Sequence, residues 1–144
     1  MLDLHHKKTL NLLRENSRRN FKDIADKLGI TIFKAYKIRD KLEREIIERY
    51  MVLLDFREIG YETRVFMILK PKVNFLNDVG LFLENCSNVN NLHLIDDFCS
   101  YFLEAIFKDM KGFSGFLNEL SRFDFNKKEI MYVSEENKKE GFIL

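Results

Sequence analysis

The residues from Asn20 to Glu45, NFKDIADKLGITIFKAYKIRDKLERE, predict two short helices joined by a tight turn. The first helix would run from Phe21 to Leu28, where apolar residues recur every three or four positions. Gly29 follows directly, and glycine enters the left-handed backbone region without steric cost. Thr31 would cap the second helix, which has a narrow apolar stripe of Ala35, Ile38 and Leu42. This pattern predicts a helix-turn-helix whose second helix has the shape to enter a DNA major groove.

The charge of this stretch supports the same interpretation. From Arg14 to Lys41 the chain carries nine basic and four acidic residues, a net charge of +5. Basic runs are usually only solvated surface, but three lysines at helical spacing would share one face of the second helix, roughly opposite its apolar stripe. The residues that we expect to contact DNA are Thr31, Ile32, Lys34, Tyr36, Lys37 and Lys41, with Arg18 and Arg19 as clamps on its backbone.

Two of these residues have alternative roles. The Thr31 hydroxyl, with the free backbone amides of the helix N-terminus, could meet a phosphate. Ile32 could touch a thymine methyl group or, equally well, pack against the preceding helix. The lysines should supply affinity more than discrimination between sequences.

Composition and length indicate a globular protein of one medium or two small domains. The chain has 144 residues, of which 46% are hydrophobic and 33% charged, proportions that exclude a disordered chain. Residues 1–55 carry a net charge of +4 and residues 56–144 a net charge of −3, so nucleic acid should meet only the N-terminal part. We expect a helix-turn-helix domain over 1–48, a linking strand and hinge over 49–60, and a regulatory domain with a tail over 61–144.

Several classes of protein are not expected from this sequence. Cys86 and Cys99 form no CxxC motif and predict buried, reduced thiols rather than a disulfide or a metal site. His5 and His6 are adjacent and would point about 100° apart on a helix, so they should not share a metal. No apolar run approaches the roughly 18 residues of a membrane span. We therefore expect a soluble, cytoplasmic protein that needs no membrane, metal or cofactor.

Outside the helix-turn-helix, apolar periodicity predicts one further helix before it and an alternation of strands and helices after it. The expected elements are a helix from Asp3 to about Asn16, strands Ile46–Leu54 and Tyr61–Lys72, a helix capped by Asn74 and reaching Cys86, strands Val89–Ile95 and Phe98–Phe107, a helix Gly112–Phe123, a strand Lys128–Val133 and a charged tail Ser134–Leu144. The order after residue 60 is that of a ferredoxin-like βαββαβ domain, so the fold class is α+β. Phe66 and Ile68 would lie on the sheet face away from the helices, which predicts pairing of that face with a second copy.

In the order and spacing of its motifs, the chain resembles the Lrp/AsnC family of leucine-responsive or feast/famine transcription regulators. The similarity covers about Leu2 to Val133. The residues that carry it are Leu2-Asp3, Lys8, Leu10, Leu12-Leu13, Glu15-Asn16-Ser17-Arg18, Ile24-Ala25, Leu28-Gly29-Ile30-Thr31, Leu42-Glu43, Ile47, Tyr50, Leu54-Asp55 and Ile59-Gly60-Tyr61. The resemblance implies a winged-type helix-turn-helix, a dimerising ferredoxin-like domain, binding of double-stranded DNA, and homodimers that can assemble into tetramers or octamers. It also implies an effector, often an amino acid, bound between dimers.

The chain departs from the family pattern at three places. Ile38-Arg39 replaces an arginine followed by an apolar residue, which could alter the phosphate contacts of the recognition helix, and Glu45 replaces a glycine. In the loop associated with effector binding, Asp97-Phe98-Cys99-Ser100 replaces a Gly-x-Tyr-Asp-like segment. The candidate effector residues are Asp96, Asp97, Phe98 and Ser100. Because two carboxylates there would repel the carboxylate of an amino acid, we do not expect an ordinary amino-acid effector.

Three functions follow from these observations. The first is a sequence-specific DNA-binding transcriptional regulator that acts as a homo-oligomer. The second is a ligand-independent modulator of a related regulator through mixed assembly. The third is an enzyme like the siroheme decarboxylases, which have similar folds. We do not expect an enzyme, because His93 is the only histidine after the helix-turn-helix.

Overall fold

A computed structural model describes residues 2–95 and 99–144 and divides the chain into two compact units. The first unit comprises residues up to 53 together with 138–144, and the second comprises residues 54–137. The end of the tail therefore belongs to the first unit. No helix in the described parts of the chain is long and apolar enough to cross a membrane.

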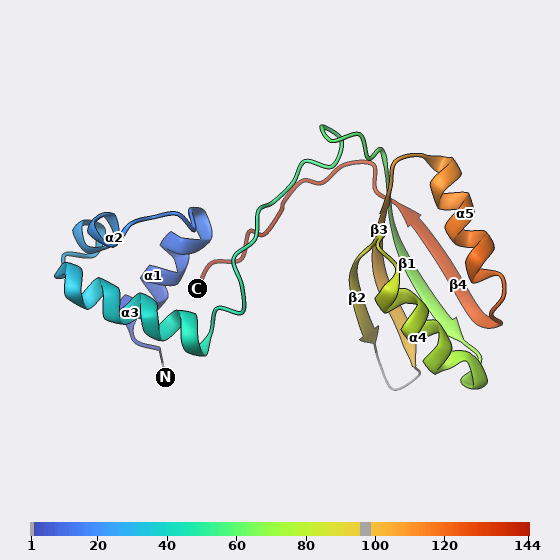
Figure 1. Cartoon of the computed structure of the whole chain (residues 1–144), viewed down its shortest axis with the longest axis horizontal. Helices are drawn as coiled ribbons and strands as arrows, with labels where there is room; N and C mark the ends of the chain where they lie inside the picture. Colours follow the sequence, from blue (N-terminus) through green and yellow to red (C-terminus); the bar gives the residue numbers. More distant parts are fainter. Residues whose placement is uncertain (1, 96–98) are drawn as a thin grey trace. The chain divides into compact units, whose positions relative to one another are not determined.

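The first unit contains three helices, labelled in Figure 1: α1 (Leu4–Glu15), α2 (Phe21–Leu28) and α3 (Ile32–Glu45). All three match the expected helices. As predicted, Asp3 caps α1, and its carboxylate accepts a hydrogen bond from the backbone N–H of His6 at 2.9 Å.

The second unit is a four-stranded antiparallel sheet with helices on one face (Figure 1). Its elements in chain order are β1 (Thr63–Pro71), a single 3₁₀ turn η1 (Val73–Phe75), α4 (Leu76–Asn85), β2 (Val89–Ile95), β3 (Ser100–Phe107), α5 (Met110–Leu120) and β4 (Phe125–Tyr132). The strand order is β2-β3-β1-β4. This βαββαβ order with β1 and β3 in the centre confirms the ferredoxin-like prediction.

The core of this unit lies between the sheet and the two helices. Alternate residues of β1 face the helices, and its register places Met67 opposite Leu103 and Val65 opposite Ala105 of β3. Phe107 packs against Phe113 and Phe116 of α5, with ring centroids 5.3 and 5.4 Å apart. The buried members of the core are Val65, Met67, Leu69, Val79, Leu83, Leu103, Ala105, Phe107, Phe113, Phe116 and Leu120.

The opposite sheet face is partly apolar and contains one buried charge. Phe66 and Ile68 are half-buried in the single chain, and Phe66 stacks on Phe102 at 5.5 Å. Glu104 is 2% exposed, and its carboxylate accepts hydrogen bonds from Arg64 and from two asparagines, Asn90 and Asn91. We refer to this helix-free surface as the open sheet face.

Three sequence-based predictions need correction. The segment from 46 to 54 is not a strand, because no described strand pairs with its backbone and β propensity alone does not make a ladder. Asn74 lies within the 3₁₀ turn η1 and caps no helix; α4 begins after Phe75 without a side-chain cap. Cys86 and Cys99 are free thiols, but Cys86 is only half-buried and Cys99 is exposed, whereas both were predicted to be buried.

Two parts of the tail are hydrogen-bonded to side chains from earlier in the chain, residues 134 and 136 in the second unit and residue 144 in the first. In the second unit, Arg57 donates to the Ser134 carbonyl at 2.8 Å, and Arg64 pairs with Glu136 at 2.9 Å. In the first unit, the Asn11 amide group bonds both the N–H and the carbonyl of Leu144, at 3.1 and 3.2 Å.

Candidate nucleic-acid interface

The turn between α2 and α3 is fixed by local hydrogen bonds. Asn20 caps α2 through a 2.8 Å bond from the N–H of Asp23. Gly29 takes the left-handed conformation (φ 63°, ψ 38°), as its place after the helix predicts. The N–H of Ile30 reaches back to the Ala25 carbonyl at 3.0 Å, and the Thr31 hydroxyl accepts the Lys34 N–H at 3.2 Å. These bonds set the direction in which α3 leaves the turn.

Small residues at the helix crossing fix which face of α3 is buried. Ala25 of α2 and Ala35 of α3 are 2% and 0% exposed and lie in one cluster with Leu13 and Ile24. Ile38 and Leu42 continue the buried stripe against Leu10 of α1. The buried contacts of α3 lie along this stripe, and the side of the helix that carries Phe33, Lys34, Lys37 and Lys41 is exposed.

The α3 residues predicted to meet DNA, Ile32, Lys34, Tyr36, Lys37 and Lys41, are all exposed. Lys34, Lys37 and Lys41 are exposed, and Lys41 has a long 3.9 Å contact with Glu45. Ile32 is 54% exposed, so it does not fill the space against α2 that the sequence also allowed. Tyr36 is 49% exposed, and its ring packs edge-on against Phe21 at 5.4 Å.

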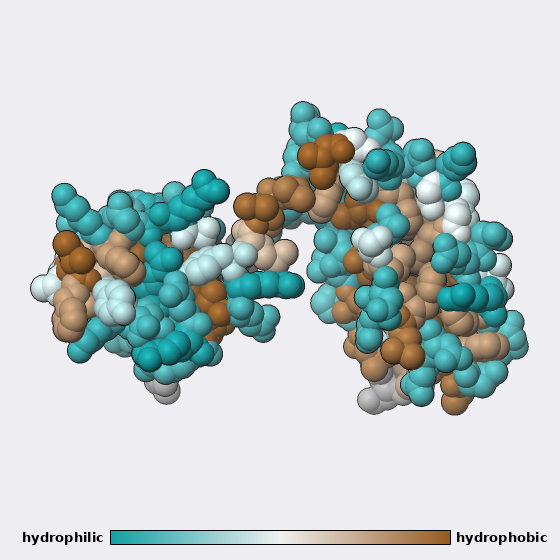
Figure 2. Space-filling model, in the orientation of Figure 1, coloured by the Kyte–Doolittle hydropathy of each residue, from teal (hydrophilic) through white to brown (hydrophobic). Residues whose placement is uncertain are grey.

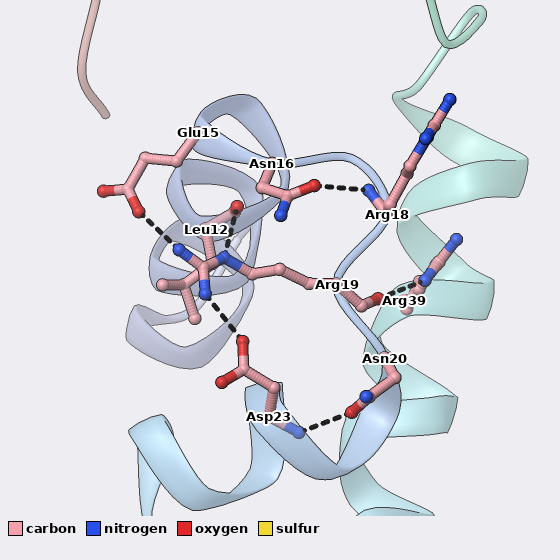
Figure 3. Close-up of polar contacts among 8 residues, drawn as sticks. All are labelled: Leu12, Glu15, Asn16, Arg18, Arg19, Asn20, Asp23 and Arg39. Atoms are coloured by element: carbon pink, nitrogen blue, oxygen red, sulfur yellow. Dashed lines mark hydrogen bonds and ion pairs between the residues drawn. The ribbon is translucent and has the colours of Figure 1, made fainter.

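Arg19 holds the three-helix unit together (Figure 3). Its guanidinium donates to the Leu12 carbonyl at 3.0 Å, to Asp23 at 2.6 Å and to Glu15 at 2.9 Å, and the side chain is only 16% exposed. The Asp23 hydrogen bond is the main cause that raises the pKa of Arg19. The prediction that Arg19 binds the DNA backbone therefore needs correction, because its guanidinium is already hydrogen-bonded to residues of α1 and α2.

Arg39 is also directed inward. It donates to the Arg19 carbonyl at 2.9 Å and to Glu43 at 2.8 Å, and it lies over the rings of Phe21 and Tyr50. Burial lowers the pKa of Arg39. The Glu43 hydrogen bond and nearby charges together raise this pKa by more than burial lowers it, so the net shift is upward. Hydrogen bonds from Arg39 and Tyr50 lower the pKa of Glu43. The order Ile38-Arg39 therefore places the apolar side chain in the core, while the arginine bonds Glu43 and the Arg19 carbonyl.

Arg18 contrasts with its neighbour. Its backbone N–H bonds the side chain of Asn16 at 2.9 Å, while its exposed guanidinium points away from the contacts drawn in Figure 3. It remains available to a DNA phosphate.

Sequence reasoning overlooked Phe33. This residue is 65% exposed, and Lys37 Nζ lies 4.6 Å from its ring centroid. At about 100° per residue, Phe33 lies across the helix from the buried stripe, whereas the lysines at 34 and 41 lie to one side of it. A helical projection of the sequence would have found it, because the most outward position of α3 near its start is an aromatic residue.

One of the four candidate effector residues, Ser100, lies in the described part of the chain. Asp96, Asp97 and Phe98 lie outside the described residues, and Ser100 is buried as the first residue of β3. His93 is exposed on β2 and stacks on Phe102 at 6.3 Å. Among the described residues no group of three or more potential ligands is placed to hold a metal ion.

Comparison with known proteins agrees with this geometry, although no family model matches the chain. An uncharacterized HTH-type transcriptional regulator of Pyrococcus furiosus is 24% identical over 139 residues, which cover 96% of this chain and 94% of the relative. The solved structure of Escherichia coli AsnC superimposes with a TM-score of 0.86 at 16% identity, covering 99% of this chain and 98% of AsnC. The chain has the Lrp/AsnC fold.

A second solved structure with this Lrp/AsnC fold is described with an amino acid. It is a Neisseria meningitidis transcriptional regulator in complex with L-methionine, with a TM-score of 0.87 and 21% identity, covering 96% of this chain and 94% of the regulator. The similarity to this and to AsnC extends over both units of the chain, which is the extent that the sequence resemblance had predicted.

Proposed function

We propose that this protein is a sequence-specific DNA-binding transcriptional regulator of the Lrp/AsnC type that acts as a homo-oligomer. The observation that carries the proposal is the open side of α3, where Lys34, Lys37 and Lys41 project from a helix whose other side is buried by Ala35 and its neighbours. Lysines on a projecting helix can neutralise phosphates on both sides of a major groove. The names of the curated relatives support the same function.

The proposed homodimer forms through the open sheet face. Phe66, Ile68 and Phe102 lie side by side there, and Met131 of β4, opposite Phe66, is 43% exposed. An apolar group of this kind on a sheet without a covering helix is typical of an interface. A dimer would present two α3 helices to two half-sites, which explains how a small unit could reach useful affinity.

We do not include an ordinary amino acid in the proposal, although one structural neighbour is an L-methionine complex. The sequence places two carboxylates, Asp96 and Asp97, in the effector loop, and like charges disfavour a second carboxylate. Regulation would then depend on oligomer assembly, including mixed assembly with a related regulator. Thermal unfolding with and without L-methionine tests this part, and a rise in the midpoint with ligand concentration would contradict it.

We propose no catalytic activity. A tetrapyrrole reaction would need proton donors around a cofactor, and His93 is the only histidine in the second unit's sequence. Absorbance titration with a tetrapyrrole should give no stoichiometric shift.

The direct test of the function is fluorescence anisotropy with fragments of the upstream region of the protein's own gene and scrambled DNA of equal length. We expect preference for the upstream fragment to survive an increase from about 50 to about 200 mM salt, because specific contacts depend less on counterion release than phosphate contacts do. Weak binding that is equal for both and lost at the higher salt would contradict sequence-specific regulation of that region.

A further inference from the structure

The most outward residue of α3 is an aromatic side chain in water. Phe33 is 65% exposed and Ile32 beside it is 54% exposed, although both stand on a well-formed helix with a complete buried stripe. Figure 2 shows hydrophobic atoms on the surface of the first unit where α3 begins, bordered by hydrophilic ones. An exposed apolar group of this kind on a monomer is typical of a contact surface.

The charges around this group indicate what the surface contacts. Lys37 lies over the Phe33 ring, and Lys34 follows directly on the helix. The nearest acid on the outward side, Asp40, pairs with Arg44. A partner that suits this surface is a polyanion that also presents apolar groups between its charges. Duplex DNA does so in its major groove, where each thymine exposes a C5 methyl group between two phosphate backbones.

The side chains near the start of α3 include few that can read a base edge by hydrogen bonds. Recognition of adenine uses asparagine or glutamine, and recognition of guanine uses arginine or lysine; residues 31–38 contain Lys34 and Lys37 but no asparagine, glutamine or arginine. Two arginines follow on α3: Arg39 is turned inward and bonded to Arg19 and Glu43, and Arg44 pairs with Asp40. Tyr36 contributes a single hydroxyl. With the lysines bound to phosphates, as the proposed function has it, base discrimination by this helix depends largely on apolar contact.

We propose that Phe33, assisted by Ile32, reads thymine methyl groups in the major groove and so selects DNA with thymines at the contacted steps. This inference rests on the proposed function, because it assigns the base-reading group of the same helix. Lys34 and Lys37 hold the phosphates, and Lys37 also keeps the Phe33 ring oriented by a cation–π contact. Burial of one methyl group contributes a factor of about four in affinity, and two half-sites in a dimer multiply it to roughly ten or more.

The test replaces thymine by uracil, which removes the methyl group and leaves base pairing and charge unchanged. Anisotropy is measured for the full-length protein with two alternating duplexes, adenine–thymine and adenine–uracil, of about two helical turns. We expect the thymine duplex to bind roughly ten-fold more tightly. Phe33→Ala should reduce that ratio to near one, and Phe33→Leu should retain part of it. Since Phe33 is exposed, the fold of these variants should be intact, as circular dichroism can verify.

Lys34→Ala is the matched control. It should weaken binding to both duplexes by the same factor and leave the thymine-to-uracil ratio unchanged, because phosphate contacts carry no base information. A ratio of one for the wild type with DNA binding intact would overturn the methyl reading and leave the proposed function in place. A high ratio that persists in Phe33→Ala would overturn the assignment to this residue.

Two other outcomes would also overturn the inference. If Phe33→Ala changes the sedimentation coefficient of the protein without changing the ratio, the exposed ring belongs to a protein interface. If neither duplex binds at low salt, the proposed function fails together with the inference.

Discussion

Two adjacent arginines with opposite roles allow a prediction about the stability of the first unit. Arg19 is 16% exposed and donates to three groups on α1 and α2, whereas the neighbouring Arg18 is exposed. Methionine removes the guanidinium of either residue and keeps an unbranched apolar stem. Arg19→Met should therefore destabilise the three-helix unit, and Arg18→Met should leave its stability nearly unchanged.

The magnitude follows from the exposure of each partner. Glu15 and Asp23 are 64% and 40% exposed, so their ion pairs with Arg19 count as screened surface pairs of at most about 1 kcal/mol each. The part-buried bond to the Leu12 carbonyl adds about 1 kcal/mol. We expect Arg19→Met to cost about 2 kcal/mol, and a unit of this size should then melt roughly 8–16 °C lower. Arg18→Met should cost less than about 0.5 kcal/mol.

Hydrogen-exchange mass spectrometry on peptides from α1 and α2 measures the change within this unit. DNA binding should show the reverse order at a temperature where both variants are folded. Arg18→Met should weaken binding through loss of a phosphate contact, and Arg19→Met should not. Equal loss of protection in the two variants, or equal loss of DNA affinity, would refute the division of roles.

Three further predictions concern single residues. Gly29→Ala should lower the free energy of unfolding by about 1–2 kcal/mol because φ is 63° at this position, and Gly29→Asn should lower it less. Urea unfolding would measure both changes, and equal stability of the two variants and the wild type would contradict the turn geometry. Asp3 should titrate with a pKa of about 2 rather than its usual 3.8, because the backbone N–H of His6 donates a hydrogen bond to its carboxylate. The contribution of Asp3 to stability should therefore be present above pH 3.8 and be lost as the pH falls through about 2. NMR of the side-chain carboxyl would measure this pKa, and an ordinary value would exclude the cap. Glu104→Gln should destabilise the second unit by about 2–3 kcal/mol because it removes the buried carboxylate that accepts hydrogen bonds from Arg64 and two asparagines, although Arg64 keeps its pair with Glu136. Glu129→Gln on exposed β4 should be nearly neutral, and similar exchange protection of β3 in both variants would oppose this.

The sequence predicted those parts of the fold whose signals are local. The bounds of α2, the left-handed Gly29 and the Thr31 cap all follow from spacing and from backbone preferences within a few residues. The order of elements in the second unit also followed from periodicity, and it determined the topology, because two strand–helix–strand crossovers in one sheet take a fixed hand and leave few alternatives. Local signals were therefore sufficient for the architecture.

Features that depend on distant partners could not be predicted in the same way. Arg39 is turned inward by its hydrogen bond to the carbonyl of Arg19, twenty residues earlier in the chain. The residues that neighbour Arg39 in the sequence do not predict that bond. The segment 46–54 has the composition of a strand, but a strand also needs a neighbour for its backbone. At the candidate site, helical spacing predicted the exposed lysines of α3. The same spacing places Phe33 on the outward side, but a search for charged residues does not select an aromatic side chain.

The central claim is that the open side of α3 holds DNA through its lysines. The most direct measurement is the salt dependence of DNA affinity for the wild type, for Lys34→Ala with Lys37→Ala, and for a control with Lys108→Ala and Lys111→Ala. The control makes the same change of charge on exposed positions of the second unit. Each phosphate contact contributes a slope of about −0.9 in log affinity against log salt, so a dimer of the α3 variant should lose a slope of roughly 3 to 4.

We predict that the α3 variant loses this slope and binds at least about ten-fold more weakly at low salt, while the control matches the wild type. Sedimentation should show the same oligomer for all three proteins, because neither pair of lysines touches the open sheet face. An unchanged slope in the α3 variant, or an equal decrease in the control, would contradict the claim that α3 holds the DNA.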